Sequence, residues 1–174
     1  DLTMMVTLYD RGARVQELID LKIRNVRLTA PATLLLSGKG RKQRYVPIME
    51  KTKGLLENYM IEDKLLKNGK EDHPLFFNSN HRPFTRPGIT YIPEKYLKNA
   101  KDKNPKILFP DRLKPHMMRH TKAIHLLEAG VNLIYIRDLL GHTSVTTTEH
   151  YAKVNSQLKR KALEAAYIEV VPDD

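Results

Sequence analysis

The fold class is indicated most clearly by one stretch near the start of the chain. Two apolar runs, Thr33-Leu34-Leu35-Leu36 and Tyr45-Val46-Pro47-Ile48, flank the segment Ser37-Gly38-Lys39-Gly40-Arg41-Lys42-Gln43-Arg44. Short apolar runs on either side of a glycine-containing turn are typical of a β-hairpin. Together with Val26 and Leu28 before them, they predict a small antiparallel sheet whose hairpin turn carries several basic side chains.

The remainder of the chain has the apolar periodicity of helices. One predicted helical face opens the chain and consists of Leu2, Met5, Val6 and Tyr9. Helices are predicted at residues 2–9, 15–19, 52–63, 85–99, 115–129, 132–140, 145–154 and 156–166.

Capping residues and prolines set the expected ends of these helices. Thr85 and Asn132 are predicted caps, and Pro115 suits a first helical turn. Gly141 is the expected left-handed stop after the helix that Asn132 begins. Pro93 lies inside a predicted helix, where a proline costs about 3 kcal/mol, so we expect a kink or an early stop there.

The composition narrows the class of protein. The chain has 174 residues, which predicts one domain, or one domain with a short tail. Lys plus Arg total 30 against 20 for Asp plus Glu, and a net charge of +10 favours a polyanionic partner or an anionic membrane surface. The absence of cysteine excludes disulfides, thiol nucleophiles and cysteine-bound zinc. No long apolar run or signal peptide is present, so a cytoplasmic location is expected.

Three local patterns carry candidate chemistry. They are Gly12-Ala13-Arg14-Val15-Gln16-Glu17-Leu18, His116-Met117-Met118-Arg119, and Leu140-Gly141-His142 with Tyr151 nine residues later. A histidine and an arginine at i, i+3 share a helix face. At a helix N-terminus they would meet an anion where free backbone N–H groups and the helix dipole also favour one. The pattern therefore predicts a phosphate site.

Taken together, these residues resemble the catalytic set of the tyrosine recombinase (phage integrase) family, which in chain order is Arg, Lys, His-x-x-Arg, His or Trp, and Tyr. The resemblance covers nearly the whole chain. Six positions in the right order form a much more specific pattern than any one of the motifs. The family's positions fall on Arg14, Lys39, His116, Arg119, His142 and Tyr151.

The resemblance implies a fold and an activity. The fold would be an α+β, predominantly helical catalytic domain over residues 1–174, with a small antiparallel β-sheet on one edge. The activity would be site-specific recombination of double-stranded DNA through a 3′-phosphotyrosyl intermediate, without a cofactor. The active assembly would be a homo-oligomer, a tetramer on paired DNA sites, with residues 155–174 docking onto a neighbour. The family's N-terminal DNA-binding domain would precede this chain, which begins inside its first predicted helix.

Elementary chemistry assigns a role to each member of the set. Two planar, permanently charged forks, Arg14 and Arg119, suit the non-bridging oxygens of a pentacoordinate phosphorane, and the second histidine of the set adds a hydrogen bond. A phenol with a pKa of about 10 is mostly neutral at pH 7, so Tyr151 needs a base such as His116. Lys39 would protonate the departing alkoxide. No metal ion is expected, because the sequence lacks the clustered carboxylates of two-metal nucleases.

Contacts to the DNA backbone are expected outside the catalytic set. Arg41, Lys42 and Arg44 belong to the cationic hairpin turn. Arg11 stands where the family often has threonine. We expect it to add a phosphate contact, and the alternative is that it has no role in binding.

Simpler interpretations exist for each motif. Arg14 and Glu17 fit a helical i, i+3 ion pair, and the hairpin cations fit a solvated turn. His116 and His120 have zinc-compatible spacing, but the Glu of a His-Glu-x-x-His motif is absent. Tyr151 could be an ordinary tyrosine of an amphipathic helix. At the level of function, the alternatives are a type IB topoisomerase-like DNA relaxation, a non-catalytic DNA-binding module and a metal-dependent nuclease.

Overall fold

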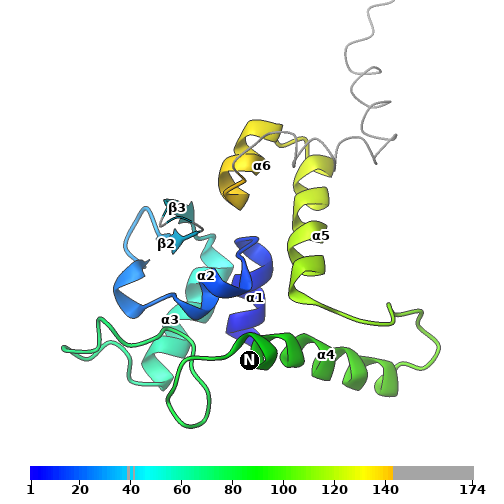
Figure 1. The fold of residues 1–174 in the computed structure, drawn as a ribbon, viewed down its shortest axis with the longest axis horizontal. Coiled ribbons are helices and arrows are strands. Elements are labelled where there is room, and N and C mark those ends of the chain that lie inside the picture. Colours follow the sequence, from blue (N-terminus) through cyan, green and yellow to red (C-terminus); the bar gives the residue numbers. More distant parts are fainter. Residues whose placement is uncertain (39, 41, 143–174) are drawn as a thin grey trace, which may run out of the picture.

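The structure, a computed structural model, describes residues 1–38, 40 and 42–142, which form a mainly helical unit with a small sheet at one edge (Figure 1). This arrangement confirms the expected α+β class. The helices are α1 (Leu2–Asp10), α2 (Val15–Ile19), η1 (Ile23–Asn25, a 3-10 turn), α3 (Glu50–Glu62), α4 (Arg86–Lys103), α5 (Pro115–Glu128) and α6 (Leu133–Leu140). The strands are β1 (Val26–Arg27), β2 (Thr33–Ser37) and β3 (Gln43–Pro47).

The sheet has the predicted hairpin as its larger part. Its three strands are antiparallel in the order β1-β2-β3, with Leu34 opposite Val46. Side chains alternate across a strand, and Leu34, Leu36 and Val46 are fully buried. One face of the sheet is thereby fixed against the helices, which holds the base of the hairpin in place.

Helix α1 lies at the centre and contacts both α3 and α5. Its predicted inward face is partly wrong. Met4, Thr7 and Leu8 are its buried residues, whereas Leu2 of the predicted face is largely exposed. A pattern of apolar residues misses Thr7 because the threonine is polar, but its hydroxyl donates to the Thr3 carbonyl at 2.7 Å and is satisfied inside the core.

Helix α4 corrects the expectation of an early stop at Pro93. It begins after Thr85, whose Oγ1 accepts from the Gly88 N–H at 3.2 Å as predicted, and continues through Pro93 to Lys103. The helix buries Ile89, Ile92 and Leu97 along with the proline. Each such side chain contributes about 1.5–3 kcal/mol on burial, which together outweigh the roughly 3 kcal/mol cost of the proline.

Helix α6 ends as the sequence predicts. Asn132 Oδ1 accepts from the Ile134 N–H at 2.8 Å, and Gly141 adopts the left-handed conformation with φ +64°. Helix α6 contacts α5 and β3, so its C-terminal end meets the base of the hairpin. The helices predicted at residues 145–154 and 156–166 lie outside the described residues.

Two glycines of this fold provide a matched test. Gly12 has φ +52°, and a Cβ there would overlap the Leu140 side chain, so Gly12→Ala is expected to lower the free energy of unfolding by about 1–3 kcal/mol. Gly54 lies inside α3, and apart from the adjoining backbone of its own helix no atom lies within 4 Å of its Cβ position, so Gly54→Ala is expected to raise stability by about 0.5–1 kcal/mol. Urea unfolding of both variants measures the two effects. Equal effects would show that the turn after α1 is not packed against α6 as described.

Candidate functional site

Three segments far apart in the sequence meet at one pocket. These are the start of α2, the base of the β2–β3 hairpin and the C-terminal end of α6. The pocket has a volume of about 550 Å³. Its lining residues are Arg14, Gly38, Lys42, Gln43, Arg44, Arg137, Asp138, Gly141 and His142.

The C-terminal end of α6 is surrounded by guanidinium groups. The last carbonyls of a helix have no partner within the helix and lie at the negative end of its dipole. Here each of three consecutive carbonyls accepts a hydrogen bond from a different arginine. The pairs are Arg44 Nε to Leu139 O at 2.8 Å, Arg119 Nη2 to Leu140 O at 2.6 Å, and Arg14 Nη2 to Gly141 O at 2.9 Å.

Glu17 binds two of the arginines that donate to the carbonyls of α6. Its side chain is 1% exposed. Arg44 donates to both carboxylate oxygens, at 2.7 and 2.9 Å, and Arg14 donates through Nη1 at 2.9 Å and through its backbone N–H at 2.8 Å. Burial alone would raise the pKa of Glu17, but the hydrogen bonds from Arg44 and Arg14 outweigh it and leave the pKa below its ordinary value. Glu17 is therefore an ionised anchor.

Arg14 forms the i, i+3 ion pair that the simpler interpretation of its motif predicts. The pair does not hide the arginine, because the Arg14 side chain is 39% exposed and lines the pocket. Gly38, at the end of β2, lies beside the same pair: a Cβ there would be 3.2 Å from Glu17 Oε1 and 3.6 Å from Arg14 Nη1. The hairpin and the first motif are thus in contact.

Arg119 extends from α5 toward the same helix end. Its Nη1 donates to the carbonyl of Gly12, while its Nη2 donates to Leu140. His116 lies one turn earlier on α5 and is exposed. The helix thus holds both members of the His-x-x-Arg motif, with Arg119 fixed against the turn that precedes Arg14.

His142 follows the left-handed glycine, and its backbone N–H donates to the Arg137 carbonyl at 3.0 Å. Burial, together with the positive charges of Arg119, Arg14 and Arg44, lowers the pKa of His142 to about 4. Near pH 7 the ring is therefore neutral, and it can donate one hydrogen bond without adding a further charge to the arginine cluster.

Two of the four residues predicted to contact DNA have partners within the protein. Arg11 is 3% exposed and pairs with Asp10 at 3.0 Å, so it belongs to the interior. Arg44 lines the pocket, but its guanidinium donates to Glu17 and to the Leu139 carbonyl. Lys42 is exposed at the pocket, as a DNA contact requires.

The remaining predicted site residues, Lys39, Arg41 and Tyr151, lie outside the described residues. Glu17 as an anchor and Arg44 as its partner were not predicted from the sequence. The available signal was Glu17 itself, a lone carboxylate three residues after the first arginine of a motif set that is otherwise rich in cations.

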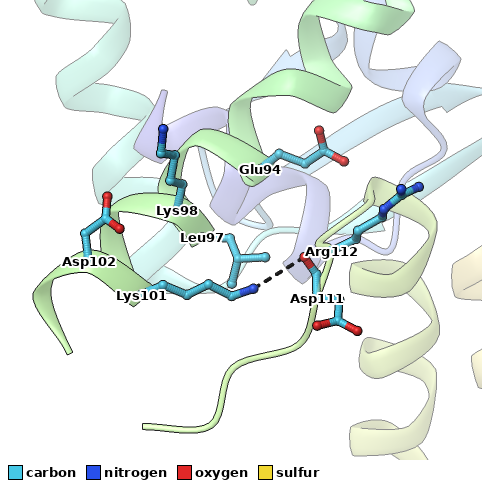
Figure 2. A pocket seen from close by; sticks show the side chains of 7 residues that line it. All are labelled: Glu94, Leu97, Lys98, Lys101, Asp102, Asp111 and Arg112. Atoms are coloured by element: carbon cyan, nitrogen blue, oxygen red, sulfur yellow. Dashed lines mark hydrogen bonds between the residues drawn. The ribbon is translucent and has the colours of Figure 1, made fainter. Parts of the chain in front are cut away.

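A second pocket of similar size, about 520 Å³, lies between α4 and the segment that leads to α5 (Figure 2). Its walls carry both signs of charge, and Lys101 Nζ donates to the Asp111 carbonyl at 3.4 Å. None of the sequence motifs contributes to it. The lining residues are Glu94, Leu97, Lys98, Lys101, Asp102, Asp111 and Arg112.

Two further findings concern only residues 1–38, 40 and 42–142. Among them, no helix is both long and apolar enough to cross a membrane. Nor do three or more His, Asp or Glu side chains gather there in a way that could hold a metal ion.

Comparison with curated proteins gives tyrosine recombinases among the relatives of this chain. The chain is 33% identical over 161 residues to tyrosine recombinase XerC of Staphylococcus carnosus (strain TM300), which covers 92% of this chain and 51% of the relative. It is 35% identical over 163 residues to XerC of Bacillus subtilis (strain 168), with the same coverage. The chain thus spans about half the length of these relatives.

Solved structures give the same result. The fold matches a crystal structure of XerA recombinase with a TM-score of 0.75 and 28% identity, over 94% of this chain and 56% of that one. It matches XerH site-specific recombinase bound to its palindromic difH substrate with a TM-score of 0.70 and 27% identity, over 96% and 44%. The model of the phage integrase family matches residues 1–157. Because the family model matches most of its length, and three arginines bind the end of α6, the chain belongs to the phage integrase family.

Proposed function

We propose that this chain cleaves and rejoins DNA strands in site-specific recombination, as the catalytic domain of a tyrosine recombinase over residues 1–174. One observation carries the proposal. Arg14 and Arg119, the two arginines of the family's set, converge on adjacent carbonyls at the end of α6, next to a pocket open to solvent. Fixed guanidinium groups at such a place stabilise charge that develops on a phosphoryl group.

The proposed reaction exchanges one phosphodiester for another. The phenolic oxygen of Tyr151 attacks the backbone phosphorus, and the bond from phosphorus to the 5′-oxygen breaks. The phenol gives its proton to a base, for which His116 is the candidate, and the 5′-oxygen takes a proton from Lys39. A 3′-phosphotyrosyl link and a free 5′-hydroxyl result. Attack by another 5′-hydroxyl reverses these steps, so no external energy source is needed.

Arg14 has donors available for this task. A guanidinium carries five N–H groups. In the described part of the chain, Arg14 uses one Nη1 and one Nη2 hydrogen for Glu17 and Gly141. Its exposed edge can donate to a phosphate without giving up these contacts, which supports a preorganised oxyanion site.

Double-stranded DNA is the proposed partner. The net charge of +10 and the exposed Lys42 beside the pocket favour a polyanion. We further propose a tetramer on paired DNA sites, with residues 155–174 docking onto a neighbour, and action on DNA in the cytoplasm. Residues 155–174 lie outside the described part of the chain.

The nucleophile is tested by Tyr151→Phe, which removes only the phenolic oxygen. The variant is expected to bind DNA as the parent does and to form no covalent complex. Denaturing electrophoresis after incubation with a nicked DNA site measures the adduct. An adduct with the phenylalanine variant would rule out Tyr151 as the nucleophile, and adduct formation without sequence preference or paired sites would favour a topoisomerase.

DNA binding at the pocket predicts a steep dependence on salt. Each neutralised phosphate contributes about −0.9 to the slope of log K against log salt concentration. Lys42→Ala should make the slope shallower by about that amount. Lys67→Ala, in a loop that lines a different pocket, is the matched control and should leave the slope unchanged. Equal slopes for both variants would remove Lys42 from the interface.

The role of Lys39 is tested through the leaving group. An alkoxide leaves poorly, because its conjugate acid has a pKa near that of water, about 15.7, whereas a thiol ionises near 8.5. A DNA site with sulfur at the bridging 5′ position should therefore restore most of the cleavage lost in Lys39→Ala. Arg119→Ala should stay impaired on the same DNA, since its target is charge on the non-bridging oxygens. Equal rescue of both variants, or of neither, would contradict a general-acid role.

A further inference from the structure

Arg44 has contacts that its position on a cationic hairpin does not predict. It comes from β3, yet its side chain is only 14% exposed. Its guanidinium reaches both oxygens of Glu17 on one side and the carbonyl of Leu139 on the other. All three of its nitrogens are therefore engaged within the protein.

The end of α6 is shaped to admit this guanidinium. A Cβ at position 141 would lie 2.7 Å from Arg44 Nη1 and 3.0 Å from its Cζ, so only a glycine leaves room for it. Gly141 also ends the helix and accepts from Arg14, and His142 follows directly. Arg44 thus touches the residue that connects two members of the catalytic set.

We propose that Arg44 is a positioning residue for the cleavage reaction. It fixes Glu17 against the last turn of α6. Glu17 holds Arg14, and the last turn of α6 leads to His142, so Arg44 sets where both residues stand relative to the scissile phosphate. This inference rests on the function proposed above. It assigns Arg44 no direct contact with the phosphate.

The geometry explains why an arginine is needed for this role. A planar fork can donate to both oxygens of one carboxylate while its Nε donates to a third group. A lysine keeps the positive charge beside Glu17 but has a single nitrogen on a flexible chain, so it cannot hold Glu17 and Leu139 in a fixed relation. A displacement of the reacting groups by about 1 Å is enough to slow a reaction roughly 10²-fold.

Arg44→Lys is the variant of choice, because it leaves no buried carboxylate without a neighbouring cation. Arg24→Lys is the matched control: Arg24 also forms an arginine–carboxylate pair, with Asp72 at 2.9 Å, but at the surface and outside the pocket. The substrates are two nicked DNA sites. One has an ordinary scissile phosphate, and the other has a methylphosphonate, in which a methyl group replaces one non-bridging oxygen and removes the negative charge.

Single-turnover adduct formation is measured for each protein on each DNA. On the ordinary phosphate, Arg44→Lys is expected to react about 10- to 100-fold more slowly than the parent. On the methylphosphonate the deficit should shrink to about threefold or less, because one negative charge fewer is present in the transition state and the placement of positive charge matters less. Arg14→Ala should show the same pattern, and Arg24→Lys should match the parent on both substrates.

The ratio of the two rates on one preparation does not depend on the folded fraction, so a loss of stability cannot imitate this pattern. An equal deficit on both substrates would reduce Arg44 to a structural role, and no deficit on either would make it dispensable. A salt slope shallower by about 0.9 in Arg44→Gln, which removes the positive charge, would identify a direct phosphate contact instead. If the parent itself formed no adduct with either DNA, the proposed function would fall first.

Discussion

The candidate site depends on the three carbonyls at the end of α6. Arg44, Arg119 and Arg14 each donate to one of them, and each arginine comes from a different element of the fold. A helix C-terminus offers unsatisfied acceptors in a fixed array and a partial negative charge of about half an electron. It is therefore a template on which permanently charged side chains can be held before any anion arrives.

Placing three guanidinium groups together costs electrostatic free energy, and the structure offsets this cost with one buried anion. Glu17 binds two of the three arginines, and its lowered pKa keeps it ionised near neutral pH. His142 stays neutral in the same surroundings, so it adds a donor without adding repulsion. The cluster retains positive charge toward the pocket, which is the preorganised arrangement that a phosphoryl transfer needs.

Two glycines of the fold let the backbone come close to neighbouring side chains in this arrangement. Gly12 lets the turn after α1 pack against Leu140, and the carbonyl of the same glycine accepts from Arg119. Gly141 admits Arg44 at the other side. The sheet and α4 do not supply any of the arginine donors except Arg44, but they bury the apolar residues that hold α2 and the hairpin in place.

The sequence by itself determined the features that depend on neighbours along the chain. The hairpin around residues 33–48, the cap at Asn132 and the left-handed Gly141 follow from local turn and capping chemistry, and the order of motif residues identified the family. Only the tertiary structure decided which cations face inward. Arg44 and Leu139 are 95 positions apart, and Arg14 and Gly141 are 127 apart, so no local pattern encodes their hydrogen bonds. Burial and electrostatic pairing arise between segments that meet only after folding, and this is why the sequence does not predict that Arg11 and Arg44 pair with groups of the protein itself.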